Sequence, residues 1–285
     1  MRYVSYEHDG SQRLGILEGQ QIVPLDGFHQ LGQNTSAEAL RHARRLDAEA
    51  VELAEVRLRP VVPNPDKVIC VGLNYRSHVS ETGRELPTYP VLFTKFASAL
   101  IGADDPIALP PESTQVDWEG EMAVVIGAVA RRVSRDQALD VVLGYTVAND
   151  VTMRDFQYKT HQWLQGKAWQ GSTPLGPSLV TPDEINGSGL AIRSCLNGEE
   201  VQSSSTSLLI FDVATLISTI STFTTLLPGD VILTGTPEGV GYRRDPQLFL
   251  ADGDLISVTI EGLGTVANRV TDEPGVVRQT WLGGV

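Results

Sequence analysis

Two glutamates separated by a single glycine stand directly before a continuous apolar run. Glu119 and Glu121 lead into residues 122–126, which read Met-Ala-Val-Val-Ile and must enter a hydrophobic core. In an extended strand, residues two apart project from the same face, so both carboxylates would lie side by side at the mouth of that core. They repel each other unless a proton or a cation lies between them. A hard divalent cation satisfies both, although an isolated Glu-x-Glu pair is more often a solvated strand face.

A third acid strengthens the cation-binding interpretation. Residues 144–150 read as a second β-rich run that ends at Asn149 and Asp150, and strand ends are where binding loops begin. Glu119, Glu121 and Asp150 together would offer three carboxylates to a hard cation, and no Cys or His accompanies them to favour a softer metal. The alternative is a purely structural Ca²⁺ site, which would complete its shell with backbone carbonyls.

Composition excludes several classes of protein. The chain has 285 residues, 41% of them hydrophobic and 20% charged, which is ordinary for a globular protein of about two domains. The net charge of −13 argues against nucleic acid and anionic membrane as partners, because both require clustered Lys and Arg. No apolar run approaches the ~20 residues of a membrane span. The first residues lack the apolar core of a signal peptide, so we expect a cytoplasmic protein.

The first sixty residues indicate a small separate α+β unit. Residues 14–25 have the pattern of a hairpin that turns at residues 18–20. A helix is predicted from Ser36, with Thr35 as N-cap, Glu38 completing a capping box, and the apolar positions Ala39, Leu40, Ala43, Leu46 and Ala50. The proline-rich residues 60–66 indicate a linker. We therefore divide the chain into residues 1–62 and residues 63–285.

Short β runs dominate the second part. Asp212 is the predicted N-cap of one helix, whose buried stripe comprises Val213, Leu216, Ile217 and Ile220. Strands without regularly alternating helices disfavour a parallel doubly wound sheet, so the expected class is α+β, predominantly β. The predicted strands are residues 68–71, 91–94, 121–126, 141–147, 231–233 and 255–260.

A series of motifs extends over most of the chain, from about residue 65 to residue 270. In order, they are KVICVGLNY (67–75) with His78 and Glu81, EGE (119–121), NDVTMRD (149–155), GK (166–167), PLGP (174–177), LPGDVILTGTP (227–237) and EGLG (261–264). In this order they resemble the fumarylacetoacetate hydrolase family. The resemblance implies a mixed β-sandwich roll, a homodimer, Mg²⁺ or Mn²⁺ at the three acids, and a small oxo-acid substrate.

His78 and Glu81 are the candidate catalytic pair. Their spacing of three residues lets the side chains meet within one helical turn, and a carboxylate beside an imidazole raises its basicity, as a general base requires. An isolated pair of this kind is more often on the surface. Here the pair follows residues 72–75, which match the family motif, and this favours a catalytic role. The polar residues 82–87, with Gly83 and Pro87, are typical of a lid.

The resemblance also implies roles for other polar residues. Lys167 would stabilise an oxyanion or deliver a proton, and Tyr75, Arg154, Gln157 and Thr236 would contact the substrate. Arg154 suits bidentate capture of a carboxylate, but it could instead pair with Asp155 or a neighbouring acid. Trp169 is either a wall of the pocket or an ordinary core residue.

The preferred activity is hydrolysis of a carbon–carbon bond in a 1,3-dicarbonyl acid of the acylpyruvate type, through a metal-bound enolate and a water activated by His78. One alternative is decarboxylation of an oxaloacetate-like acid, and another is a hydratase or tautomerase reaction on related dienoates. A non-catalytic metal-binding relative is the third class, but the presence of His78, Glu81 and Lys167 disfavours it.

Overall fold

The strand that begins between the two glutamates lies at the centre of the fold. In the computed structural model, which describes residues 1–273, β11 (Gly120–Ile126) is buried along its whole length. Met122, Val124 and Ile126 pack into one apolar cluster, whereas Ala123 and Val125 pack into another. Successive side chains of a strand point to opposite faces, so the continuous apolar run reflects a strand covered on both sides.

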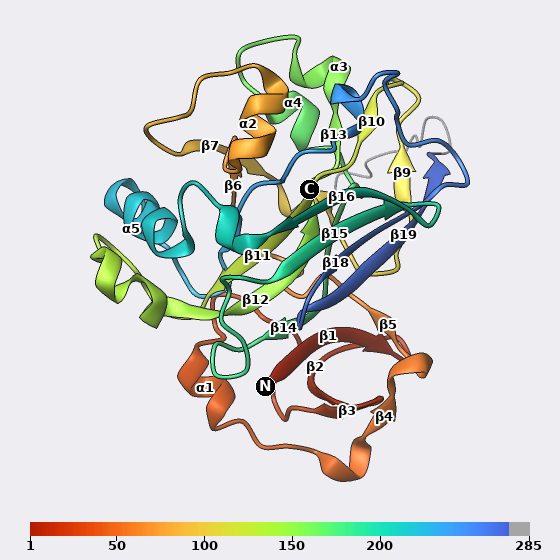
Figure 1. Cartoon of the computed structure of the whole chain (residues 1–285). Coiled ribbons are helices and arrows are strands. Elements are labelled where there is room, and N and C mark those ends of the chain that lie inside the picture. Colours follow the sequence, from red (N-terminus) through yellow and green to blue (C-terminus); the bar gives the residue numbers. More distant parts are fainter. Residues whose placement is uncertain (274–285) are drawn as a thin grey trace, which may run out of the picture.

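A twelve-stranded mixed sheet runs through the molecule (Figure 1). Most neighbours are antiparallel, but β17 pairs with β6 in parallel. In spatial order the strands are β4 (Val51–Glu52), β3 (Gln21–Pro24), β2 (Ser11–Glu18), β1 (Arg2–His8), β14 (Thr173–Val180), β12 (Val142–Asn149), β11, β17 (Val231–Leu233), β6 (Val68–Gly72) and β7 (Val91–Lys95), with β5 (Arg57–Leu58) on β1 and β8 (Leu100–Ile101) on β14.

A second sheet packs on the central strands of the first. Ile192, Val258 and Ile260 from this sheet share an apolar cluster with Met122 and Val124, which confirms the expected mixed β architecture with stacked sheets. Its strands are β16 (Glu199–Ser205), β15 (Ala191–Leu196), β18 (Leu255–Ile260), β19 (Gly264–Asp272) and β9 (Ile107–Leu109), while β10 (Val116–Asp117) and β13 (Thr152–Met153) form a separate pair.

The helices are few and short. In α5 (Val213–Phe223), the Asp212 side chain accepts a hydrogen bond from the Thr215 N–H, and the predicted apolar stripe is buried as expected. Within residues 1–273, no helix is long and apolar enough to cross a membrane. The other helices are α1 (Ala37–Arg41), α2 (Arg76–Thr82), α3 (Arg154–Gln157) and α4 (Leu164–Lys167), and the 3-10 turns are η1 (Asp47–Glu49), η2 (Leu53–Glu55), η3 (Ala97–Ala99), η4 (Arg135–Val141), η5 (Thr206–Leu208) and η6 (Gly241–Arg243).

The predicted N-terminal helix was wrong in length and in its cap. It ends at Arg41, and the N-cap is Ser36 rather than Thr35, because the Ser36 hydroxyl accepts the Ala39 N–H at 3.1 Å. The following segment turns back along the end of β3. There the Leu46 N–H donates to the Pro24 carbonyl at 2.9 Å. Pairing with a distant strand therefore replaces the helical hydrogen bonds that the apolar spacing had suggested.

The N-terminal segment extends the large sheet. The predicted hairpin is confirmed as β2 and β3, and β1 pairs with β14 through Arg2–Val180 and Tyr3–Leu179. The proline-rich junction is packed as well, since Val61 and Val62 are fully buried. All six strands predicted in the second part are confirmed to within two residues at each end. The division at residues 62 and 63 stays a prediction.

Candidate active site

Strand pairing brings the three predicted metal ligands together. Gly120 pairs with Asn149 across β11 and β12, and the Asp150 N–H donates to the Glu119 carbonyl at 2.8 Å. Carboxylate oxygens of Glu119, Glu121 and Asp150 lie within 4.8 Å of one another, and all three residues are buried. The glycine between the glutamates faces the second sheet, where a Cβ atom would lie only 2.4 Å from the Ser194 hydroxyl.

Buried cations surround two of the three carboxylates. The Lys167 ammonium donates to Glu119 at 2.7 Å and to Asp150 at 2.8 Å, and Arg154 contacts the other Glu119 oxygen at 2.7 Å. Gly166 allows this placement, because a Cβ atom there would lie 2.6 Å from the backbone of Gln157 and push α4 away from α3. Glu121 has no cation partner within residues 1–273 and accepts the Gly235 N–H at 2.7 Å.

The pKa values reflect this unequal pairing. Burial raises the pKa of Glu121 well above its usual range, and the neighbouring Asp150 and Glu119 raise it further. Burial acts in the same direction on Glu119, but Lys167 and Arg154 outweigh it and lower that pKa to about 2. Burial alone would lower the pKa of Lys167, yet Asp150 and Glu119 raise it. The three oxygen donors suit a hard divalent cation, which would let Glu121 ionise.

Lys95 is a second buried lysine that sequence reasoning missed. Its ammonium lies 2.6 Å from Asp150 Oδ1, and neither side chain is exposed. It also donates to the Val151 carbonyl at 3.0 Å. Lys95 thus holds one oxygen of Asp150 while Lys167 contacts the other. The only signal in the sequence was a lysine at the end of an apolar strand, which gives no indication of its partner.

Breaking this buried ion pair should destabilise the protein. We expect Lys95→Met to lower the free energy of unfolding by about 3–5 kcal/mol, because Asp150 would keep a buried charge with one partner fewer. Urea unfolding of the metal-free protein measures this, with Lys159→Met at an exposed position as the matched control. A loss no larger than that of the control would show that Lys95 does not stabilise Asp150.

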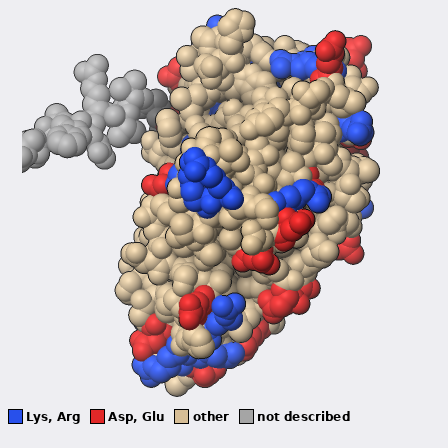
Figure 2. All heavy atoms as spheres, turned by 90° about the vertical axis from the view of Figure 1, so that its left-hand side faces the viewer, with Lys and Arg blue, Asp and Glu red and all other residues tan. Residues whose placement is uncertain are grey.

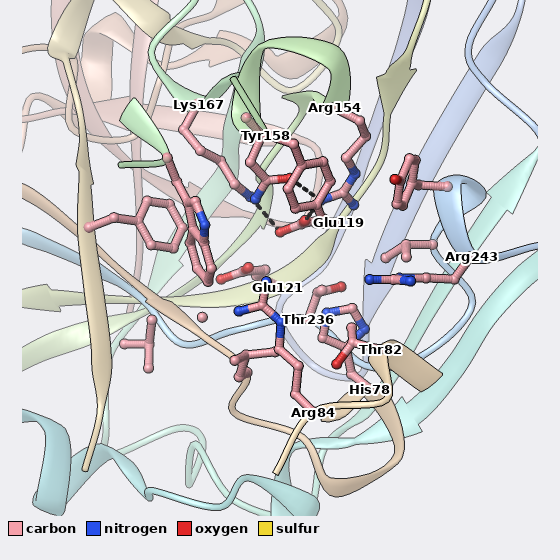
Figure 3. A pocket seen from close by; sticks show the side chains of 18 residues that line it. His78, Thr82, Arg84, Glu119, Glu121, Arg154, Tyr158, Lys167, Thr236 and Arg243 are labelled. Carbon is pink, nitrogen blue, oxygen red and sulfur yellow. Dashed lines mark hydrogen bonds and ion pairs between the residues drawn. The ribbon is translucent and has the colours of Figure 1, made fainter. Parts of the chain in front are cut away.

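His78 and Glu81 meet on α2, as their spacing predicted. His78 Nδ1 lies 3.0 Å from Glu81 Oε2, and Glu81 Oε1 accepts the Gly239 N–H at 2.9 Å. The Glu81 carboxylate is thereby held between the His78 imidazole and the loop that contains Gly239. The histidine lines the same pocket as Glu119, Glu121 and Lys167, on the other side from the lysine (Figure 3).

The predicted substrate contacts are placed unequally. Gln157 and Thr236 line the pocket and are buried. Arg154 pairs with Asp117 and Glu119 rather than with Asp155, but its Nη2 is buried without a partner among the described residues. Tyr75 is buried outside the pocket wall, with its hydroxyl also unpartnered in residues 1–273.

A tryptophan does line the pocket, but it is Trp163 and not Trp169. Trp163 packs edge-on against Phe93, with ring centroids 5.4 Å apart, and covers Gly72. Trp169 instead packs against Phe156 beside an apolar cluster. The pocket has a cavity volume of about 30 Å³, enough for roughly two water molecules.

Family models match almost the whole described chain. The model described as fumarylacetoacetate (FAA) hydrolase C-terminal matches residues 67–271, and the one described as Rv2993c-like, N-terminal matches residues 1–60. A relative named oxaloacetate tautomerase fahd2, mitochondrial, from Xenopus laevis is 39% identical over an alignment 288 positions long. The alignment covers 95% of this chain and 90% of that protein.

Solved structures share the fold over nearly their full length. One is a 2-hydroxyhepta-2,4-diene-1,7-dioate isomerase from Mycobacterium marinum, 35% identical with a TM-score of 0.82, and the match covers 96% of this chain and 99% of the other. Another is maleylpyruvate hydrolase from Sphingobium sp. SYK-6 in complex with manganese(II) and pyruvate. It is 29% identical with a TM-score of 0.75, covering 96% of this chain and 100% of the other.

Proposed function

The chain belongs to the fumarylacetoacetate hydrolase family and is an enzyme, and from this premise we propose that it interconverts the keto and enol forms of oxaloacetate or a closely similar 2-oxo dicarboxylic acid. The observation that carries the proposal is the His78–Glu81 pair, 3.0 Å apart, facing three clustered carboxylates across a small pocket. Tautomerisation needs a base beside a polarised oxo group, and this pocket has residues suited to both tasks.

His78 acts as the base. Its Nδ1 is engaged by Glu81, so Nε2 is the ring nitrogen left to take a proton from the carbon next to the oxo group. Glu81 stabilises the imidazolium that forms. As the carbon–carbon double bond develops, negative charge accumulates on the oxo oxygen. Lys167 can donate to that oxygen, and so can Arg154 Nη2, which has no partner within residues 1–273. The oxygen then receives the proton that His78 has taken from the carbon.

We propose Mg²⁺ or Mn²⁺ as the cofactor, held by Glu119, Glu121 and Asp150. When bound, the cation would act as a Lewis acid on the oxo group. Two observations support this assignment. The three donors are buried carboxylates, and a structural relative was solved with manganese(II). The cation would also compensate the charge of ionised Glu121, which lacks a cationic partner within residues 1–273.

The comparison with known proteins supports tautomerisation, because the Xenopus relative named for it aligns with 95% of this chain. The test follows the ultraviolet absorbance of enol-oxaloacetate as it relaxes, with and without purified protein and Mn²⁺. Relaxation no faster than in buffer containing Mn²⁺ alone would refute the proposal.

Acylpyruvate hydrolysis, preferred from the sequence, is the second candidate. The maleylpyruvate hydrolase structure, with a TM-score of 0.75, favours it, and His78 could activate a water instead of taking a proton from carbon. Decarboxylation of oxaloacetate needs the same cation site and no water. Incubation with acylpyruvates, fumarylpyruvate and oxaloacetate separates the three reactions. Hydrolysis of an acylpyruvate releases pyruvate and a second carboxylic acid without CO₂, decarboxylation of oxaloacetate releases pyruvate and CO₂, and tautomerisation cleaves no carbon–carbon bond.

We also propose a cytoplasmic homodimer with no nucleic-acid or membrane partner. The face shown in Figure 2 supports the dimer, since much of its surface belongs to uncharged residues. A hollow beside the edge strand β7 is lined by Phe96 and Phe223, whose exposures are 54% and 59%. Large exposed aromatic side chains beside a strand at the edge of a sheet suit a second copy of the chain. Light scattering during size-exclusion chromatography tests this assembly.

A further inference from the structure

Two arginines of the pocket are not used by the proton transfer described above. Arg84 and Arg243 line the pocket together with Glu119, Glu121 and His78. Arg154 and Lys167 are engaged by carboxylates at 2.7–2.8 Å. By contrast, neither the Arg84 nor the Arg243 guanidinium makes an ion pair or hydrogen bond with another residue of the described part, 1–273. Figure 3 shows both side chains directed into the pocket, across from Lys167.

Aromatic rings hold both guanidinium groups in place without occupying their N–H donors. The Arg84 Cζ lies 5.7 Å from the centre of the Trp163 ring, and the Arg243 Cζ lies 5.2 Å from that of Tyr242. Stacking on a ring face orients the planar guanidinium and leaves its donors free. Two such groups directed into one pocket offer free donors to an anion with two oxygens.

The loop that carries Arg243 is anchored to the catalytic residues. The buried carboxylate of Asp117 accepts the Gly241 N–H at 2.7 Å and the Tyr242 N–H at 3.0 Å, and it also accepts Arg154 Nε at 2.8 Å. The buried Asp117 therefore determines the position of η6, which contains Arg243, relative to Arg154.

Arg84 is attached to the helix of the candidate base. It follows Gly83, the C-cap of α2 with φ of +67°, and its own N–H donates to the Val79 carbonyl at 3.4 Å. An anion held by Arg84 would therefore restrain the end of the same helix that places His78. Binding at this position would couple recognition of the far end of a substrate to the placement of the base.

We propose that Arg84 and Arg243 form a subsite for the second carboxylate of a dicarboxylic substrate, a proposal that rests on the oxo-acid function. The 2-oxo acid end lies at the three acids and their cation, and the far carboxylate meets the two guanidinium groups. The chain has a net charge of −13, but the local positive charge of the two guanidinium groups attracts a dianion into the pocket. The enzyme therefore selects dicarboxylates over monocarboxylates of equal length.

The test uses two non-reacting probes with the same carbon skeleton. Malate has a second carboxylate where 2-hydroxybutanoate has a methyl group, and both can chelate a cation through the hydroxy-acid end. Calorimetric titration in saturating Mn²⁺ should show malate binding about 10- to 100-fold more tightly to the wild-type enzyme. Arg84→Gln and Arg243→Gln should each weaken malate binding about tenfold and change 2-hydroxybutanoate binding by less than about twofold. Arg243→Lys should retain part of the preference.

Arg76→Gln is the matched control, because Arg76 is exposed on the same helix and does not line the pocket. It removes one positive charge and should leave the preference intact. Equal binding of the probes to the wild type, binding of neither, or equal losses for both probes in the two variants would overturn the subsite. A preference for malate without tautomerisation of oxaloacetate would refute only the proposed function. Tautomerisation without the preference would refute only the subsite.

Discussion

Removal of the divalent cation with EDTA is expected to abolish turnover, and Mg²⁺ or Mn²⁺ should restore it. Glu121→Gln should also abolish turnover, and added Mg²⁺ or Mn²⁺ should not restore it. Glu121 is the informative ligand, because Lys167, Arg154 and Lys95 already compensate the other two acids. Its pKa is raised by burial and by the neighbouring Asp150 and Glu119, so a neutral glutamine of the same shape costs the metal-free protein little and can still accept the Gly235 N–H.

Thermal unfolding separates loss of the cation from loss of the fold. The wild type should gain about 2.7 kcal/mol of stability at a Mn²⁺ concentration one hundred times the Kd, and Glu121→Gln should gain almost none. Glu85→Gln, at an exposed position, is the control with the same change of charge. Full activity after chelation and dialysis, or equal stabilisation of the variant and the wild type by Mn²⁺, would contradict the assigned site.

Replacement of His78 by alanine should cut the proton-transfer reaction by about 10²–10⁴-fold, the usual contribution of a general base. Glu81→Gln should follow the same pattern more mildly, because it removes the charge that supports the imidazole and leaves the ring in place. Stabilisation by Mn²⁺ should be unchanged in both variants, since neither residue belongs to the three-acid cluster. The measurement is kcat under saturating Mn²⁺, with Ser80→Ala on the exposed side of α2 as control.

A second reaction tests the role assigned to His78. Any decarboxylation of oxaloacetate should fall much less than tautomerisation or hydrolysis in His78→Ala, because the cation alone supports that reaction. Lys167→Ala should damage every reaction, because all of them develop negative charge on the same oxygen. Equal losses of decarboxylation and proton transfer in His78→Ala would mean that His78 serves binding or closure of the pocket.

The sequence by itself determined the features that depend on neighbours a few residues apart. The Glu-Gly-Glu spacing predicted two carboxylates on one face of a buried strand, and the separation of His78 and Glu81 predicted their contact. The Asp212 cap and its apolar stripe predicted α5. In each case the periodicity of a single strand or helix sets the geometry, so the spacing is sufficient.

Only the tertiary structure decided the contacts between distant segments. Lys95 and Asp150 are 55 positions apart. Asp117 contacts Arg154, which is 37 positions away, and Gly241 of η6, which is 124 positions away. Arg84 and Arg243 line the same pocket only because the end of α2 and the η6 turn both lie beside it. The N-terminal helix stopped early for a related reason, since residues near Leu46 pair with β3. Such contacts depend on which strands become neighbours. That arrangement follows from burying all the apolar faces of the chain together, so local spacing does not encode it.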